Sequence, residues 1–525
     1  MSETKAYLIG GGLSSLSAAF YLIKDGELEG RNITIFEELH TAGGSLDAID
    51  HPEHNGYFMR GFRMLEQFVY SAVFDLMSNI PTLDDPQKTV LEEFNEFNEK
   101  VKTLALARLV RNGAPIDARP FKMTISDRIK ILRLLSTNER KLENVKIEDY
   151  FSPAFFDSNL WYEFCTTFSF QPWHSVIEMK RYILRFIQDA HQMDTSECIR
   201  STPLNQFESI VLPLKTWLIK NGVQFRRNCS VTDLGFDLTD QKKMVSHISF
   251  TNGNGQETIE ISKNDIVFIS TGSMTSDSTI GSMDKAPEKV TERKDNAWIL
   301  WEKLSKTSLE FGRPAVFNSN IDKSKWVSFT VTLKDPLFLQ LLEKITQRKA
   351  GSEGPITITD SNWFISFGVP NQPHFKCQPE NISVFWGYAL HPDKLGNFVK
   401  KKMSECTGHE ILTELIHHLK FEEHIDRIIS SSVCIPCLMP YITSQFMPRK
   451  LGDRPQVVPK NSENFAFIGQ YCEIPDDIVF TLDYSVRSAQ TAVYTLLKLD
   501  KKPTPIYKGH HNPLIILRTI KTVFR

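Results

Sequence analysis

A glycine-rich turn near the start of the chain has the spacing of a nucleotide-binding motif. Residues 6–23, AYLIGGGLSSLSAAFYLI, run from a short apolar strand through Gly10-x-Gly12-x-x-Ser15 into a helical pattern. Gly10 permits the tight turn, Gly12 lets backbone amides approach a pyrophosphate, and Ser15 is small enough for the helix to pack on the strand. The amino end of that helix then attracts phosphate charge. A plain glycine loop is the alternative, so the surrounding residues decide between the two.

Acidic and basic residues downstream favour a flavin dinucleotide. The second strand ends in Glu37, twenty-five residues after Gly12, where a carboxylate can accept hydrogen bonds from both ribose hydroxyls, and Glu38 is the alternative. A second small-residue turn, TAGGSLDA, follows and suits the long FAD molecule better than NAD. Arg60 and Arg63 in MRGFR can lie beside the phosphates or the flavin edge. We therefore predict FAD as the cofactor.

The pattern of apolar residues predicts the elements that position these groups. Residues 5–37 read as strand, turn, helix and strand, and residues 465–498 return to strand, turn and helix. Residues 124–142 carry the 3.6-residue period of an amphipathic helix, and 248–261 are typical of a hairpin. The aromatic-rich stretch 155–193 is either a helical core or the wall of an apolar pocket.

The order of these elements predicts an α/β fold whose lobes interleave along the chain. We expect a Rossmann-type FAD-binding domain of discontinuous segments, a largely α-helical substrate lobe and a C-terminal helical tail. The predicted FAD-binding segments are 1–75, 205–290 and 455–500. The other predicted segments are 76–204 for a mainly helical substrate lobe, 291–454 for a substrate-binding lobe and 501–525 for a basic amphipathic tail.

Composition excludes several classes of protein. A net charge of −2 over 525 residues gives no field that would attract nucleic acid. Eight scattered cysteines fit a reducing compartment, and Cys434-x-x-Cys437 lacks a second ligand pair for zinc, so we predict no metal site. The chain shows no basic signal-peptide region and no run of 18 apolar residues. These features predict a cytoplasmic protein.

The end of the chain has the pattern of a surface-binding helix. Leu514, Leu517, Ile520 and Phe524 can share one helix face, with Arg518 and Lys521 beside it. Such a helix can lie on an anionic bilayer, and the alternative is a helix that docks on its own protein. We predict peripheral contact with the inner face of a membrane through residues 510–525.

Longer motifs reveal a resemblance to a known family. The stretches NLWYEFCTTFSFQPWHSVIEMKRY, NQFESIVLPL, STGSMTSDSTIGSMD, CIPCLMPYITSQFMPR and GQYCEIPDDIVFTLDYSVRSAQ resemble the oleate hydratase family, once called myosin-cross-reactive antigens. The likeness runs from about residue 5 to 525. It implies an FAD-dependent enzyme that adds water to the cis-9 double bond of a free unsaturated fatty acid, such as oleate, linoleate or palmitoleate. The product is a 10-hydroxy acid, formed without net flavin redox.

The resemblance implies catalytic roles, and this sequence departs from one of them. Alkene hydration needs a proton donor at one carbon and an activated water at its neighbour. The family's EMKxY tyrosine matches Tyr182, the expected proton donor. The family motif RGGRE reads RGFRM here, so Met64 stands where the family has a glutamate associated with water activation or flavin positioning. Methionine cannot transfer a proton. Glu66 is a candidate substitute, and the alternative is a solvated carboxylate on a helix face.

The resemblance also implies binding residues for the substrate and the flavin. Gln206 and His374 are expected at the carboxylate end of the fatty acid. The flavin is expected to contact Leu13, Glu37, Ser45, Thr481 and Ser485, and the general layout of flavoproteins adds Val231 and Ser273. Because the first strand begins within six residues of Met1, there is no room for the N-terminal extension by which some relatives dimerise. A monomer is expected, with a homodimer as the alternative.

Two other functions stay open. A flavin oxidoreductase or isomerase that acts on lipids would share the cofactor and the apolar pocket, but a redox reaction would consume an electron acceptor. A catalytically silent protein that binds FAD and a fatty acid is the second alternative, because Met64 removes an acid–base group.

Overall fold

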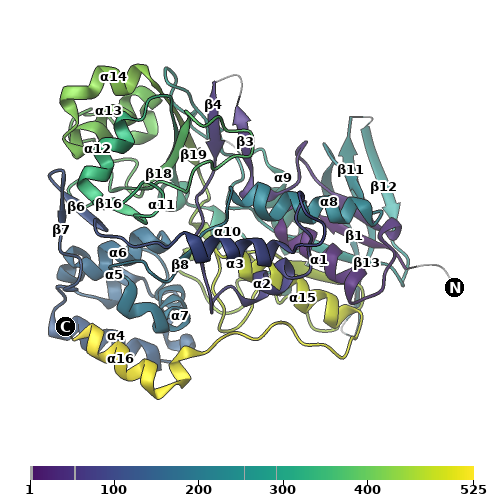
Figure 1. Cartoon of the computed structure of the whole chain (residues 1–525). Coiled ribbons are helices and arrows are strands. Elements are labelled where there is room, and N and C mark those ends of the chain that lie inside the picture. The colour runs from purple at the N-terminus through teal and green to yellow at the C-terminus, as the bar shows by residue number, and fades with distance from the viewer. Residues whose placement is uncertain (1–3, 52–54, 240, 254, 291–292, 525) are drawn as a thin grey trace.

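A five-stranded parallel sheet forms the nucleotide-binding side of the molecule (Figure 1). The computed structural model describes residues 4–51, 55–239, 241–253, 255–290 and 293–524. The strand order is β20–β13–β1–β2–β9, and every pairing is parallel. The strands are β1 (Ala6–Ile9), β2 (Ile33–Phe36), β9 (Gln224–Arg226), β13 (Ile266–Ser270) and β20 (Phe465–Ile468). Three distant stretches of the chain therefore contribute to one sheet.

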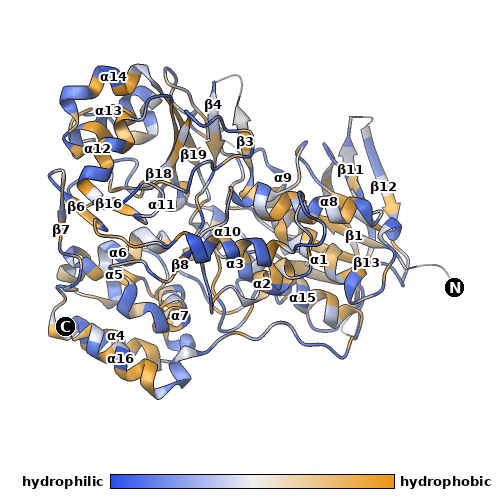
Figure 2. Ribbon diagram, viewed as in Figure 1, coloured by the Kyte–Doolittle hydropathy of each residue, from blue (hydrophilic) through white to orange (hydrophobic). Residues whose placement is uncertain are grey.

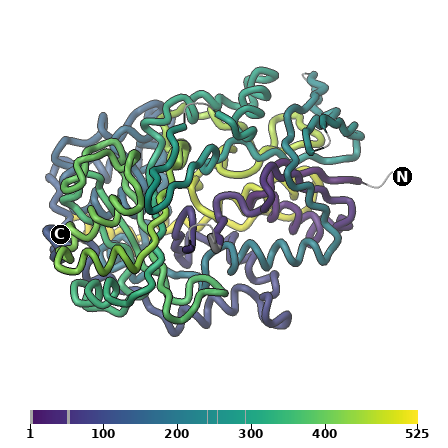
Figure 3. The backbone as a smooth tube through the Cα atoms, turned by 90° about the horizontal axis from the view of Figure 1, so that it is seen from above, coloured from purple at the N-terminus to yellow at the C-terminus, as the bar shows by residue number. Residues whose placement is uncertain are grey.

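Helices from both ends of the chain pack together beside this sheet. α1 (Leu13–Lys24) lies against α15 (Leu482–Leu496), and α8 (Leu212–Lys220) covers α1 from another side. In Figure 3 the purple N-terminal elements lie beside yellow segments from the end of the chain. Every residue of β1 and β2 is buried. Because both faces of these strands are covered, their sequences do not alternate between apolar and polar residues. The predicted strand–turn–helix units at both ends of the chain are confirmed.

A three-stranded antiparallel sheet adjoins the nucleotide-binding sheet. It consists of β10 (Ser230–Leu238), β11 (Lys243–Asn252) and β12 (Gly255–Glu260). β11 pairs with β12 from His247–Glu260 to Asn252–Gly255, so the predicted hairpin is confirmed.

The second large sheet overturns one prediction. Its eight strands run in the order β14–β19–β15–β18–β17–β16–β6–β7. They are β14 (Thr279–Ile280), β19 (Ser432–Met439), β15 (Trp326–Leu333), β18 (Ser383–Ala389), β17 (Ile365–Gly368), β16 (Ile356–Ile358), β6 (Leu109–Arg111) and β7 (Ala114–Ile116). The substrate lobe as a whole is therefore not largely α-helical, because five of these strands come from residues 291–454, which were predicted only as a substrate-binding lobe. Every residue of β15 is buried, so its sequence lacks the alternation of apolar and polar residues that identifies a half-buried strand.

Helices complete both halves of the molecule. The predicted amphipathic helix is α4 (Ile125–Ser136), and its amino end is capped by Thr124, whose hydroxyl accepts from the Asp127 amide at 3.1 Å. The remaining helices are α2 (Ser71–Met77), α3 (Val90–Lys100), α5 (Ile147–Tyr150), α6 (Asn159–Phe168), α7 (Val176–Arg185), α9 (Asn296–Thr307), α10 (Ala315–Asn318), α11 (Ile321–Ser324), α12 (Leu337–Thr346), α13 (Gly408–Leu419), α14 (Ile425–Ser430) and α16 (Pro513–Val523).

Two short antiparallel pairs connect the halves. β3 (Ala48–His51) pairs with β4 (Gly56–Met59), and β5 (Leu65–Glu66) pairs with β8 (Ile199–Arg200). Among the described residues, no helix is long and apolar enough to cross a membrane. Cys434 and Cys437 are buried in β19, which lies between β14 and β15 in the eight-stranded sheet.

Candidate functional site

A cavity of about 310 Å³ opens at the carboxyl ends of the parallel strands. All the residues predicted to contact the cofactor line it, except Ser15: Gly10, Gly12, Leu13, Glu37, Glu38, Ser45, Arg60, Val231, Ser273, Thr481 and Ser485. Ser15 is buried in α1, with its hydroxyl 3.4 Å from that of Ser270 on β13. This placement matches the packing role predicted for a small residue at that position.

The floor of this cavity is a cradle of bare backbone. Gly10 has a φ of +87°, which side chains rarely adopt, and Gly12 forms a bridge with Gly43. Gly44 has a φ of +61°, and a Cβ built there would lie 3.0 Å from the Cα of Gly12. A pyrophosphate can therefore approach amide groups that no side chain shields.

Charged groups surround the cradle with a pattern that fits a dinucleotide. The amino ends of α1 and α15 both reach the cavity, through Leu13 and Thr481, and Arg60 and Arg63 line it as well. Helix amino ends and guanidinium groups both stabilise phosphate charge. Arg60 also lies 3.3 Å from Asp47, which limits its freedom to move.

Both candidate ribose-binding carboxylates lie in this cavity. Glu37 accepts hydrogen bonds from the amides of Gly11 at 2.7 Å and Leu39 at 2.8 Å. Glu38 accepts from the Ser230 hydroxyl at 3.1 Å and from a backbone amide of α9 at 3.2 Å. Burial raises the pKa of each carboxyl group. Because a carboxylate can accept about four hydrogen bonds, each can still bind a ribose hydroxyl.

A second, mostly apolar cavity of about 240 Å³ adjoins the first. Arg60, Arg63, Phe480, Thr481 and Leu482 line both cavities. Its walls come from α4, α6, α7, α16 and the eight-stranded sheet. Aromatic residues of the stretch 155–193 line it and also belong to the core, so both interpretations of that stretch hold. We call this space the acyl cavity, because its apolar walls suit an alkyl chain.

Tyr182 lies on the wall of the acyl cavity, on α7. Its ring packs on Phe168, with centroids 4.9 Å apart, and its hydroxyl donates to the Val479 carbonyl at 2.6 Å. Val479 directly precedes the residues that line both cavities, so the phenol lies close to their junction. Burial raises the pKa of the Tyr182 phenol well above its ordinary value. The group is thus a neutral, fixed hydroxyl in an apolar setting.

Buried ion pairs fix the helix that carries Tyr182. Glu178 on α7 lies 2.8 Å from Arg449 and 3.1 Å from Arg454, with all three side chains inaccessible to solvent. Burial opposes ionisation of Glu178, but Arg454 and Arg449 lower its pKa to about 2. Two turns further along α7, Arg185 lies 3.3 Å from Asp477. Because breaking one partner of a buried pair leaves an isolated charge, these contacts hold α7 in one position.

Met64 and Glu66 both line the acyl cavity. Glu66 is only 4% exposed and ends strand β5, so the alternative of a solvated carboxylate on a helix face is wrong. Its oxygen Oε2 accepts hydrogen bonds from the amides of Phe68 at 2.8 Å and Val69 at 2.6 Å. The sequence could not reveal this burial because the contacts come from a turn and from β8, far along the chain.

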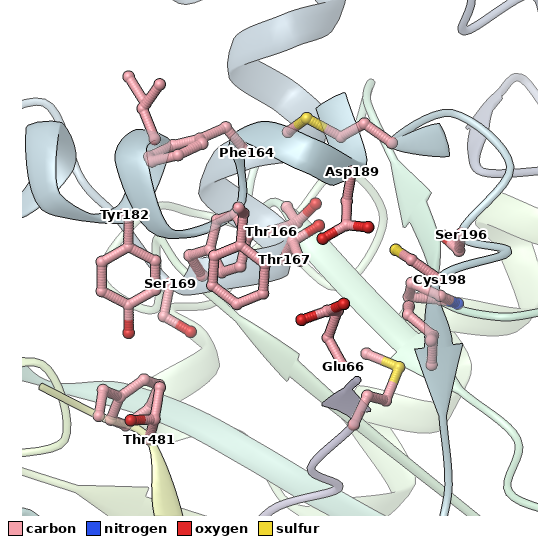
Figure 4. Close-up of a pocket in the computed structure, with 18 of the residues that line it drawn as sticks. Glu66, Phe164, Thr166, Thr167, Ser169, Tyr182, Asp189, Ser196, Cys198 and Thr481 are labelled. Atoms are coloured by element: carbon pink, nitrogen blue, oxygen red, sulfur yellow. The ribbon is translucent and has the colours of Figure 1, made fainter. Parts of the chain in front are cut away.

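Asp189 is a lining residue that the sequence analysis missed. It follows α7 in the 3₁₀ turn Ile187–Gln192, and Figure 4 shows its carboxyl group pointing toward that of Glu66. Burial, with the nearby Glu66, raises its pKa to about 7. In the sequence, the one indication that Asp189 lines a cavity was its position as an acidic residue inside an apolar, aromatic stretch, and this indication is weak by itself.

Gln206 and His374 do not line the acyl cavity among the described residues. The Gln206 amide donates to the Arg63 carbonyl at 2.9 Å and to the Thr202 hydroxyl at 3.1 Å, so it supports the Arg63 loop. His374 is 1% exposed, and burial lowers its pKa to about 3. Both nitrogens of its imidazole lack a hydrogen-bond partner among the described residues, so the expected role at the carboxylate end of the substrate stays a prediction. Phe62 lies between His374 and the cavity, with ring centroids 5.8 Å apart.

The C-terminal helix α16 both docks on the protein and exposes an apolar face. Thr519 and Val523 are buried and line the acyl cavity, and the Thr519 hydroxyl donates to the Ile187 carbonyl at 3.1 Å. On the outside, Leu514 is 73% and Leu517 52% exposed. Figures 1 and 2 show α16 beside α4, which exposes Ile125. The alternative of a helix that docks on its own protein is therefore confirmed for the inner face, and the outer face stays exposed.

Known proteins resemble this chain over nearly its whole length. The model of the MCRA family matches residues 3–494. An oleate hydratase from Streptococcus pyogenes is 39% identical over 509 residues, covering 95% of this chain and 86% of that protein. A linoleate hydratase from Lactiplantibacillus plantarum is 34% identical over 570 residues, covering 100% of this chain and 99% of that protein. The structure of an oxidoreductase from Methanosarcina mazei matches with a TM-score of 0.50 and 13% identity, over 94% of this chain and 100% of that one, which indicates a shared fold.

Proposed function

Because the chain belongs to the MCRA family, we propose that it is an FAD-dependent hydratase of free unsaturated fatty acids, with oleate as its main substrate. One observation carries the proposal: the fixed hydroxyl of Tyr182 lies in an apolar cavity that joins a dinucleotide-shaped cavity. The reaction adds water to the cis-9 double bond and gives a 10-hydroxy acid.

In this proposal one cavity binds the cofactor and the acyl cavity binds the substrate. The glycine cradle, the helix amino ends and Arg60 would hold the dinucleotide, and the flavin, when bound, would tune the electrostatics of the site. The acyl cavity excludes bulk water and aligns the bent chain. Tyr182 donates a proton to one carbon of the double bond, and a water molecule attacks the other carbon.

Heavy-oxygen water separates this proposal from its alternatives. Purified flavin-loaded protein, incubated with oleate in H₂¹⁸O, is expected to form hydroxy acid that carries one ¹⁸O atom, as measured by mass spectrometry. No electron acceptor should be consumed, because hydration leaves the flavin redox state unchanged. Acceptor consumption would favour a lipid oxidoreductase, whereas tight oleate binding without product would indicate a silent binding protein.

We further propose that the outer face of α16 contacts anionic membranes, where free fatty acids partition. Replacing Leu514 and Leu517 by serine should lower the fraction that sediments with anionic vesicles at least tenfold. Burial of a leucine contributes about 1.5–3 kcal/mol. The fold should remain unchanged because both side chains are exposed.

A matched control uses another exposed leucine. Leu309 is 85% exposed and lies outside both cavities, so Leu309→Ser should bind vesicles like the unmodified protein. Equal sedimentation of the Leu514/Leu517 variant and this control would contradict the membrane proposal.

A further inference from the structure

Two carboxyl groups face one another within the acyl cavity. Glu66 ends β5 and Asp189 follows α7, so they are far apart in the chain. Both line the cavity, and in Figure 4 their oxygens point toward one another, to one side of Tyr182. An apolar cavity that holds two carboxyl groups bears a cost of desolvation, and such sites are often functional.

Each carboxyl group keeps one oxygen free. Glu66 uses Oε2 for two backbone amides, and Asp189 uses Oδ2 to accept from the side chain of Gln188 at 2.9 Å. No described residue donates a hydrogen bond to Oε1 of Glu66 or Oδ1 of Asp189. A buried water molecule needs two to four polar partners. The two free oxygens can supply the first two.

The pair holds a proton near neutral pH. Burial raises the pKa of both groups, and the nearby Glu66 carboxylate raises that of Asp189 further. The charged or titratable groups that interact with the pair are Arg185 of α7, Arg200 of β8, Tyr70 and the adjacent Cys198. Glu66 has the backbone amides and both arginines near it, so it is the member that keeps the negative charge.

Building on the hydratase function proposed above, we propose that Glu66 is the general base for the attacking water and that Asp189 orients this water. The pair would thus replace the glutamate that the family has where this chain has Met64. Since Met64 lines the same cavity, the replacement carboxylate enters the same space from two residues further along.

The proposed step balances without a redox partner. The electron pair of the double bond takes the phenolic proton of Tyr182 and forms a new C–H bond. An oxygen lone pair of the water forms the C–O bond at the neighbouring carbon, and the water proton passes to the Glu66 carboxylate. Return of that proton to the tyrosinate restores the resting state. The negative charge of the pair also keeps the fatty acid carboxylate away from this part of the cavity.

Substitution of each carboxyl group tests the assignment. With the flavin-loaded full chain and oleate in H₂¹⁸O, Glu66→Gln should lower the hydration rate at least 100-fold, within the range of about 10²–10⁴ for general acid–base catalysis. Asp189→Asn should lower it about tenfold. It should also remove the titration near pH 7 that belongs to Asp189 and leave the acidic limb of the pH profile in place, because Asp189 is neutral when Glu66 ionises.

Two further variants separate catalysis from structure. Glu197→Gln removes an exposed carboxyl group beside β8 and should keep the wild-type rate. The double variant Met64→Glu/Glu66→Gln should hydrate oleate at least tenfold faster than Glu66→Gln alone. A purely structural role for Glu66 would not produce this recovery. Flavin absorbance and the unfolding temperature verify folding in each case.

The outcomes distinguish the two proposals. If the wild type incorporates ¹⁸O and Glu66→Gln keeps more than half of that rate, the assignment of Glu66 is overturned and the hydratase function stands. If Glu66→Gln loses activity but Met64→Glu does not restore any, the role as replacement base is also overturned. A wild type that binds flavin and oleate without labelled product overturns both proposals.

Discussion

Replacement of Tyr182 by phenylalanine is expected to lower oleate hydration by about 10²–10⁴-fold, the usual contribution of a positioned acid. The variant removes the only atom of this side chain that can donate a proton and keeps the ring contacts with Phe168. Since the pKa of the phenol is far above neutrality, the loss should be the same across pH 6–8. The measurement is ¹⁸O incorporation by the flavin-loaded variant.

A second buried tyrosine provides the control for Tyr182→Phe. The Tyr484 hydroxyl also donates to a backbone carbonyl, that of Cys472 at 2.7 Å, but the residue lines neither cavity. Loss of either hydrogen bond costs about 1 kcal/mol of stability. Tyr484→Phe should unfold at the lower temperature, because the Tyr484 hydroxyl also accepts from the buried Ile474 amide at 2.8 Å, yet this variant should hydrate oleate at close to the wild-type rate. Equal activity of both variants would exclude Tyr182 as the proton donor.

The second large effect is expected at the glycine cradle. Gly44→Val should lower flavin affinity at least tenfold, which corresponds to about 1.4 kcal/mol. A branched residue is strained at a φ of +61°, and its Cβ would lie 3.0 Å from the Cα of Gly12, a main-chain atom that cannot rotate away. The displaced turn can no longer approach a pyrophosphate. Flavin retained after purification and titration of the apoprotein with FAD measure the effect.

Gly452 provides the control for Gly44→Val, because it also has a positive φ but has no atom near the position of a Cβ. Its φ is +97°, and nothing lies within 4 Å of a Cβ built there. Gly452→Val should therefore lose stability through strain alone and still bind FAD with wild-type affinity. Loss of flavin from both variants would indicate general destabilisation. Normal flavin binding by Gly44→Val would contradict the placement of the pyrophosphate on this cradle.

Groups that are close together in the chain could be identified from the sequence. The turn from Gly10 to Ser15 depends on local spacing, and the strand, turn and helix that frame it occupy neighbouring residues. The same is true of Thr481 at the amino end of α15. Because helix amino ends and glycine turns bind phosphate through backbone groups, residue type and spacing alone indicated the dinucleotide cavity.

Only the tertiary structure decided which polar side chains share the acyl cavity. The fully buried strand β15 has no alternation, so the eight-stranded sheet was not predicted. The sequence placed Gln206 and His374 beside the substrate, but their side chains turn into the protein. Conversely, Glu66 and Asp189 meet across the cavity although more than a hundred residues separate them. The direction in which a side chain points depends on how distant segments pack, and burial by those segments sets its pKa.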